Sequence, residues 1–343
     1  MGKRQSQGPE AKVATPATAK AHAFTFGDPE PIDRAALLDY VQVWNNGRWY
    51  EPPISVQGLA NMLRVAPHHS SAIFIKRNLL VSSFVPTRYL SVADFEAFVT
   101  DYLVFAHAYL EQIPAMSGRL LKLKRSPALF TRVGVHDGSC WFVPYTGEAF
   151  QFENRVCQLL APDVNQEIYG VPEYLSALHA AQLNKSATLF RRKYYDNGSH
   201  AGFILYMTDA AQQSEDIDAM REALRSSKGP GNFRNLFMYA PNGKKDGLQL
   251  IPISEVAAKD DFAAIKNTSR DDILAAHRVP PQLLGMIPTN AGGFGDVEKA
   301  KQVFVENEVA PIRAKMLGLN AQLGVDAFRF SKVDGLPPNQ VGR

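Results

Sequence analysis

Two pairs of adjacent acids come nearest in this sequence to a catalytic pattern: Asp260-Asp261 and Asp271-Asp272. Carboxylates gathered at one point can hold two metal ions, but such ions lie only about 4 Å apart. The pairs are 11 residues apart, which is about 16 Å along a helix. We therefore interpret the four acids as an acidic stripe on one helix face, turned toward solvent or a channel.

A glycine-rich run, Gly292-Gly293-Phe294-Gly295, precedes a predicted helix, and helix N-termini can hold phosphates. However, the acids Asp296 and Glu298 follow at once, and the lysine and hydroxyl residues of a phosphate-binding loop are missing. The sequence also contains no G-x-S-x-G, H-E-x-x-H or C-x-x-C motif. We interpret the run as a mobile loop and the chain as a non-enzymatic protein without a cofactor.

The remaining metal-ligating residue types are scattered. His68 and His69 precede a predicted helix, and adjacent histidines on a helix point to different faces, so the two cannot easily share one metal ion. Cys140 and Cys157 lie in apolar, strand-like runs. They are expected to be buried and inert, with a disulfide between them as the less favoured alternative. No metal site is predicted.

Two basic stretches have alternative interpretations. Arg191, Arg192 and Lys193 end a predicted helix, where cations complement the helix dipole. The stretch Arg119–Arg125 fits a solvated strand edge or, as the less favoured alternative, a nucleic-acid contact.

Composition limits the possible classes of protein. The 343 residues are 45% hydrophobic and 21% charged, which fits roughly two globular domains. Residues 1–23 carry four bases and one acid, whereas the rest of the chain carries 33 of each sign. The basic segment lacks apolar residues and is predicted to be a disordered tail, and a neutral body does not favour tight duplex binding. No apolar run approaches the roughly 20 residues that span a bilayer, so no membrane contact is expected.

The helices and strands that position these residues are predicted from the spacing of apolar residues and from helix-capping residues. Helices are predicted over residues 34–44, 59–63, 73–80 and from Ser91, where Phe95, Phe98, Tyr102, Phe105 and Tyr109 share one helical spacing. Short runs such as 140–143 and 156–160 predict antiparallel strands. The fold class is therefore α+β.

In the second half, two long helices, 172–195 and 254–278, bracket a small module. The module comprises strands 201–208, 236–240 and 248–253, and a helix that begins at Ser214. A last helix, 296–323, contains Pro311, which should kink it. A long helix pair buries little surface by itself, so this layout favours packing against neighbours in an oligomer.

Several strings in the sequence closely resemble portal proteins of tailed bacteriophages, in particular the PBSX-type family of contractile-tailed phages. The strings are Tyr169–Tyr174 (YGVPEY), Phe190–Gly202 (FRRKYYDNGSHAG), Asn235–Pro241 (NLFMYAP), Ala276–Gly285 (AHRVPPQLLG), Val303–Glu308 (VFVENE) and Glu51–Ile54 (EPPI). The resemblance covers about residues 24–330.

The resemblance implies a subunit with an α/β wing, two long stem helices, a small inserted α/β clip and a kinked C-terminal helix. Laid on this sequence, its parts are a disordered basic tail (1–23), the first part of the wing (24–171), stem helices (172–199 and 254–279), the clip (200–253), a tunnel loop (280–295), the kinked wing helix (296–330) and a flexible C-terminus (331–343). Thr289, Asn290, Gly292, Gly293 and Phe294 would then face DNA. Asp260, Asp261, Asp271 and Asp272 would lie near the channel wall, and Arg191, Arg192 and Lys193 at a stem end.

The resemblance also implies the partners. A homo-oligomeric ring, typically of twelve subunits, would sit at one capsid vertex of the virion and conduct double-stranded DNA without sequence specificity. Terminase, scaffold, capsid and head completion proteins would dock on it, and assembly would take place in the cytoplasm of the bacterial host. The alternatives are a monomeric DNA-binding adaptor and a DNA-processing packaging component, which the neutral body and the missing catalytic motifs disfavour.

Overall fold

The computed structural model describes residues 22–24, 43–164, 166–196, 203–207, 236–239, 248–252, 258–286 and 296–331. The chain divides into two units. The larger unit comprises residues 31–188 and 260–343, and the smaller comprises residues 1–30 and 189–259. The module predicted over 200–253 lies within the smaller unit.

Three helices open the described part of the larger unit: α2 (Val56–Met62), α3 (Pro67–Ser83) and α4 (Val92–Phe105). Local chemistry sets where they begin. The hydroxyl of Ser55 accepts a hydrogen bond from the Gly58 amide, and that of Ser91 accepts one from the Asp94 amide. Pro67 stands in the first turn of α3, where no amide hydrogen is needed. The predicted cap at Ser91 is confirmed.

Helix α4 ends earlier than its spacing predicts. Ala106 takes a left-handed conformation with φ 62°, and the chain turns into strand β2 (His107–Pro114). Tyr109 therefore lies on a strand, and its predicted place on the helix face is wrong. The apolar spacing continues past Phe105 by coincidence, because the helix and the strand that follows it both carry buried apolar side chains.

Two three-stranded antiparallel sheets follow. One has the order β3-β2-β7, with β3 at Leu120–Ser126 and β7 at Val156–Leu160, and α4 packs on β2 and β3. The other has the order β4-β5-β6, with strands Thr131–Val133, Cys140–Phe142 and Phe150–Gln151. The strands predicted at both cysteines are confirmed. Both thiols are free and buried, and burial raises the pKa of Cys140 to about 12 and that of Cys157 to about 11.

The main core of the larger unit contains a group of packed aromatic rings. The rings of Phe84 and Phe95 stack with centroids 3.9 Å apart, and Phe328 and Phe330 pack edge-on against Phe95. These contacts attach the end of the described chain to α3 and α4, so the helix that precedes Phe328 is held against the sheet.

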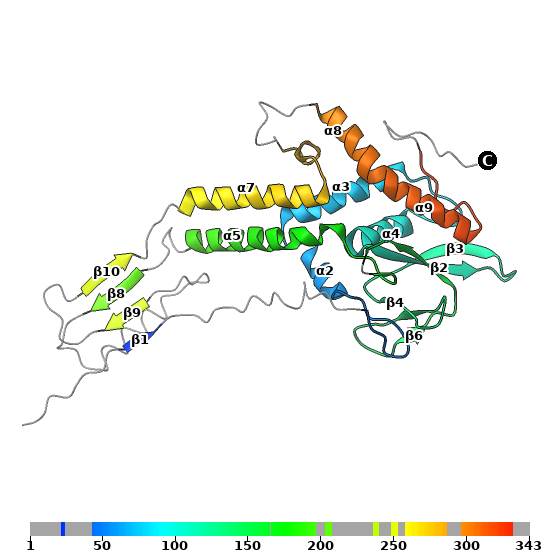
Figure 1. The fold of residues 1–343 in the computed structure, drawn as a ribbon, viewed down its shortest axis with the longest axis horizontal. Helices are drawn as coiled ribbons and strands as arrows, with labels where there is room; N and C mark the ends of the chain where they lie inside the picture. The colour runs from blue at the N-terminus through cyan, green and yellow to red at the C-terminus, as the bar shows by residue number, and fades with distance from the viewer. Residues whose placement is uncertain are drawn as a thin grey trace, which may run out of the picture. The chain divides into compact units, whose positions relative to one another are not determined.

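The two long helices are α5 (Leu178–Asp196) and α7 (Ala258–His277). The short 3₁₀ helix η1 (Glu173–Ala177) precedes α5, and the short 3₁₀ helix η2 (Pro281–Leu284) follows α7. The helix predicted from Pro172 thus begins with a tight 3₁₀ turn. Within the larger unit, α5 and α7 lie side by side (Figure 1), and the Asn184 amide group donates to the Ser269 hydroxyl at 2.8 Å. Ala177 and Ala181 pack with Ile273. Residues later in α5 therefore contact residues earlier in α7, so the two helices run antiparallel.

The last helix is interrupted just before its proline. It consists of α8 (Val297–Phe304), a π-turn η3 (Val305–Val309) and α9 (Ala310–Leu323). Pro311 lies in the first turn of α9, where its ring is accommodated. The sequence predicts a kink at Pro311; in the structure the helix is irregular just before this proline, at the π-turn.

The described strands of the smaller unit form a sheet of order β1-β9-β8-β10. Its strands are His22–Phe24 (β1), Phe203–Met207 (β8), Leu236–Tyr239 (β9) and Leu248–Pro252 (β10), and only the β8–β9 pairing is parallel. The three predicted strands of the module are confirmed. The helix predicted from Ser214 lies outside the described residues, and so does most of the one predicted over 34–44, of which only residues 43 and 44 are described and are not helical.

One predicted boundary is wrong. The tail predicted to be disordered ran to residue 23, but His22 and Ala23 belong to β1 and pair with Tyr239 and Met238. Main-chain pairing offsets the entropy of ordering this segment, which its side chains alone would not do. Residues 1–21 lie outside the described part of the chain.

Candidate functional site at a junction of three helices

The structure places the predicted acids on α7. Asp271 and Asp272 are exposed, and Asp271 Oδ1 accepts from Arg270 Nε at 2.8 Å. Asp260 and Asp261 also belong to α7, but their side chains lie outside the described part. Because α7 is unbroken between the pairs, they stay about 16 Å apart along its axis. In the part of the chain that the structure describes, no cluster of three or more histidine, cysteine or acidic residues could hold a metal ion.

The other predicted site residues divide between described and undescribed parts. Arg191 and Arg192 are exposed near the end of α5, and the side chain of Lys193 lies outside the described residues. The predicted tunnel-loop residues also lie outside them: Thr289, Asn290, Gly292, Gly293 and Phe294. Among the described helices, none is both long and apolar enough to cross a membrane.

In the basic stretch of β3, Arg125 has a structural role. Its guanidinium donates from Nε and Nη2 to the two carboxylate oxygens of Asp101, at 2.8 and 2.6 Å. Asp101 also accepts from the Ala128 amide, while burial raises the pKa of its carboxyl group. Lys122 and Lys124 are exposed on this strand at the sheet edge, which fits the solvated-edge interpretation.

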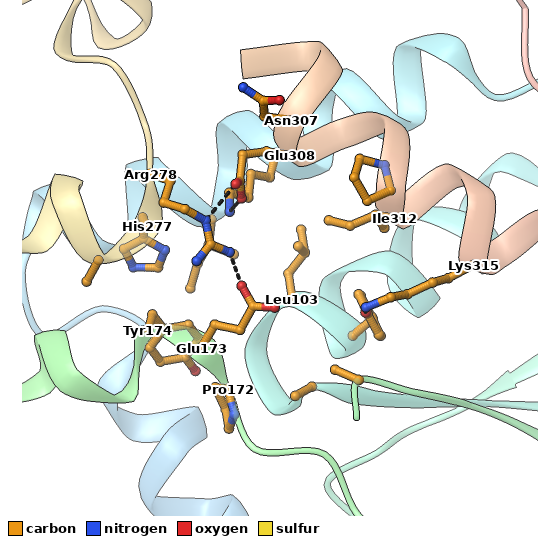
Figure 2. Close-up of a pocket in the computed structure, with 17 residues that line it drawn as sticks. Leu103, Pro172, Glu173, Tyr174, His277, Arg278, Asn307, Glu308, Ile312 and Lys315 are labelled. Atoms are coloured by element: carbon orange, nitrogen blue, oxygen red, sulfur yellow. Dashed lines mark hydrogen bonds and ion pairs between the residues drawn. The ribbon is translucent and has the colours of Figure 1, made fainter. Parts of the chain in front are cut away.

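A cavity of about 170 Å³ lies elsewhere in the larger unit, where the C-terminus of α7 meets η1 and the π-turn (Figure 2). Helices α3, α4 and α9 also contribute to its wall. Its charged lining residues are Lys76, Glu173, Arg278, Glu308 and Lys315. The cavity thus combines apolar walls with cations and acids brought together from segments far apart in the sequence.

Glu308 is the centre of this charge cluster. Its Oε2 accepts from Lys76 Nζ at 2.8 Å, and its Oε1 accepts from Arg278 Nε at 2.6 Å. Arg278 also donates from Nη2 to Glu173 (Figure 2). The side chains of Lys76 and Glu308 are both only 10% exposed, so this ion pair is largely screened from water. Burial lowers the pKa of Lys76, and the bond to Glu308 opposes that shift.

The backbone presents these groups through two irregular turns. Arg278 has φ 55° and ends α7 in a left-handed conformation, and the amide of Val279 bonds back to the Leu274 carbonyl at 3.0 Å. Pro280 prevents the helix from continuing. Glu308 is presented by the π-turn. Both charged side chains thus project from places where a regular helix is broken.

Beside the ion pairs lies a buried aromatic cluster. His277 Nε2 and His69 Nδ1 are 3.0 Å apart and share a hydrogen bond, and the ring of Tyr174 stacks on that of His277 with centroids 5.1 Å apart. Burial lowers the pKa of His69 to about 4. Burial, the second histidine and Lys76 lower the pKa of His277 to about 3. Both rings are therefore neutral near pH 7, and the Tyr174 hydroxyl donates to the Val104 carbonyl.

The junction is suited to holding helices together rather than to acid–base or nucleophilic chemistry. Each of its acids is engaged by a cation, and its histidines pair with each other. The sequence analysis did not single out Glu173, Arg278 or Glu308, since Arg278 is 105 residues from Glu173 and 30 from Glu308. A signal was nevertheless present: these residues lie in three of the strings that carry the resemblance, 169–174, 276–285 and 303–308.

Comparison with known proteins defines the class. A family model described as "Phage portal protein" matches residues 86–331. The chain belongs to the phage portal protein family, the head–tail connectors of tailed phages. The expected family is thereby confirmed at this level, and the finer PBSX-type assignment stays a prediction.

Two relatives make the assignment more specific. The probable portal protein of Escherichia phage P2 is 52% identical over 334 residues, covering 96% of this chain and 97% of its own length. The probable portal protein of Haemophilus phage HP1 is 33% identical over 290 residues, covering 82% and 84% of the two chains.

Solved structures share the fold. An HK97-family phage portal protein from Corynebacterium diphtheriae matches with a TM-score of 0.54 at 16% identity, covering 81% of this chain and 97% of its own. A chain from the neck of a native GTA particle, computed with C12 symmetry, matches with a TM-score of 0.56 at 16% identity, covering 84% and 87%. The predicted α+β portal-type fold class is confirmed.

Proposed function

We propose that this portal protein assembles into a closed ring of twelve subunits at one capsid vertex, and that double-stranded DNA enters and leaves through the channel of that ring. The observation that carries the proposal is the 52% identity to the phage P2 portal protein over almost the whole of both chains. The twelvefold symmetry of the similar GTA neck structure supports the subunit number.

We assign the parts of the ring as follows. Helices α5 and α7 form the stem, the sheet of the smaller unit belongs to the clip, and the sheets with α2–α4 and α8–α9 form the wing. Residues 280–295 contain the tunnel loop. The clip receives terminase during packaging and head completion proteins afterwards, while scaffold and capsid proteins contact the wing, and assembly takes place in the host cytoplasm.

We propose that the acids of α7 make the channel wall negatively charged. Asp271 and Asp272 are exposed, and we assign them, with Asp260 and Asp261, to the wall that DNA passes. Carboxylates repel the DNA phosphates, so the duplex gains no adhesive contacts that would slow its transit. Such a wall reads no base sequence, since only contacts to base edges carry sequence information.

The ring supplies a passage and a docking platform, and we assign it no catalytic step. A monomeric DNA-binding adaptor would need a basic folded body, whereas residues 24–343 carry equal numbers of bases and acids. A DNA-processing enzyme would need clustered metal ligands, and the acid pairs of α7 lie too far apart for a shared two-metal centre. Neither alternative is favoured.

The test uses heads assembled with or without this chain and supplied with the packaging motor and DNA. Heads with the wild-type chain are expected to protect a full genome from nuclease, and heads without it are expected to protect none. Heads that carry Asp260→Asn, Asp261→Asn, Asp271→Asn and Asp272→Asn together should package more slowly or stall. DNA uptake without the chain would refute the portal function, and unaltered uptake by the fourfold variant would refute the role of the acids.

A further inference from the structure

Glu308 connects two helices that meet at the junction. Lys76 comes from α3 and Arg278 from the end of α7, and each donates to a different oxygen of the same carboxylate. The Arg278 guanidinium also holds Glu173 at the start of η1. One buried side chain of the α8–η3–α9 helix thus fixes the C-terminus of α7 and, through Arg278, the turn that leads into α5.

The π-turn determines where this carboxylate lies. A π-turn contains one residue more than the α-helical turn it replaces. One residue corresponds to about 100° of rotation around a helix axis, so the π-turn changes which face α8 presents relative to α9. Phe304, Val305 and Val309 are all buried in the main core, which holds the turn in place while Glu308 projects into the cavity (Figure 2).

The same region anchors η2, the element that follows α7. Leu283, Leu284 and Met286 pack against the core cluster that contains Phe304 and Val305. Elements η2 and α8 are the described neighbours of residues 287–295 in the sequence. The position of η2 relative to α8 is therefore set by apolar packing and by the Glu308–Arg278 ion pair.

The geometry points to Glu308 as a positioning residue, which couples the end of α7 to α8 and so holds the two flanks of residues 287–295 in a fixed relation while DNA passes. This inference rests on the portal function proposed above. Glu308 acts through Arg278.

A structural role for Glu308 must be separated from this coupling. Glu308→Met leaves Lys76 buried without its counter-charge, which destabilises a protein whatever the function of the pair. The double variant Lys76→Met/Glu308→Met replaces the buried ions by apolar side chains and removes that penalty, yet still deprives Arg278 of its partner on the π-turn. Glu306→Gln is the matched control, since Glu306 is exposed on the same turn and accepts from Gln302.

The three variants and the wild type are compared by thermal unfolding, by hydrogen exchange of peptides that cover α8 and η2, and by DNA protected per head. The double variant is expected to recover the melting temperature of the wild type, while exchange in α8 stays about tenfold faster because a charge-assisted bond is lost. Its packaging is expected to stay reduced, and Glu306→Gln should match the wild type throughout.

Recovery of α8 exchange and packaging together with the melting temperature would overturn the inference and leave Glu308 with a role in stability alone. If Glu308→Met does not fold, the double variant still decides between these outcomes. Failure of the proposed function is distinguishable, because wild-type heads would then protect no DNA, whereas the exchange comparison would still report whether Glu308 couples the helices.

Discussion

Replacing Gly170 by alanine is expected to destabilise the larger unit by about 3 kcal/mol or more, as severe overpacking does. A Cβ at Gly170 would lie 2.1 Å from the carbonyl oxygen of Ala106 and 2.8 Å from its Cβ. That oxygen accepts a hydrogen bond from the Ala161 amide at 2.9 Å, and Ala106 is itself in a left-handed turn. Main chain rather than a flexible side chain would have to move.

Thermal unfolding of Gly170→Ala measures this effect, and a fall in melting temperature of roughly 6–12 °C is expected for a unit of this size. Gly318→Ala is the matched control. Gly318 lies within α9 and has no atom within 4 Å of an added Cβ, so the helical propensity of alanine should stabilise the protein by up to about 1 kcal/mol. A Gly170→Ala protein as stable as the wild type would contradict the packing described for Ala106.

Acidification is expected to weaken the junction through the buried histidine pair. The folded-state pKa values of about 4 for His69 and about 3 for His277 lie below the value of 6.5 for an exposed imidazole. Below about pH 6.5 the unfolded chain therefore binds protons that the folded chain does not. The stability that neutral histidines contribute is complete above that pH, and each loses about 1.4 kcal/mol per pH unit as the pH falls.

The measurement is the free energy of unfolding between pH 6 and 4.5 for the wild type and His277→Gln. Carboxylates titrate in the same range, so the difference between the two proteins is the relevant quantity. The glutamine variant should show a slope shallower by about 1.4 kcal/mol per pH unit, because one buried imidazole is gone. His136→Gln, which alters an exposed histidine in a surface turn, controls for the substitution itself. Equal slopes for His277→Gln and the wild type would contradict a neutral buried pair.

Local signals in the sequence predicted much of the fold. The Ser91 cap and the apolar runs at Cys140 and Cys157 depend on neighbours in the chain, and each identified its element. The end of α4 could not be predicted, because it depends on the close packing of Ala106 against Gly170 rather than on a glycine at the turn itself. Likewise, β1 is ordered by a partner strand more than 200 residues away.

The junction was beyond local reasoning for the same reason. In the sequence Lys76, Glu173, Arg278 and Glu308 look like ordinary solvated charges. Only the tertiary fold brings Lys76 within 2.8 Å of Glu308, across 232 residues. The quoted strings carried the family resemblance without showing why they belong together. The structure supplies a reason, since three of them converge on one cavity.

The mass of the purified protein in solution tests the central claim most directly. A closed ring of twelve 37.9 kDa chains should give a narrow peak near 455 kDa in mass photometry or sedimentation, well separated from a monomer or dimer. The account predicts that peak, together with weak and non-specific binding of duplex DNA at moderate salt. A protein that stays monomeric at every concentration and binds duplex DNA tightly under those conditions would contradict it.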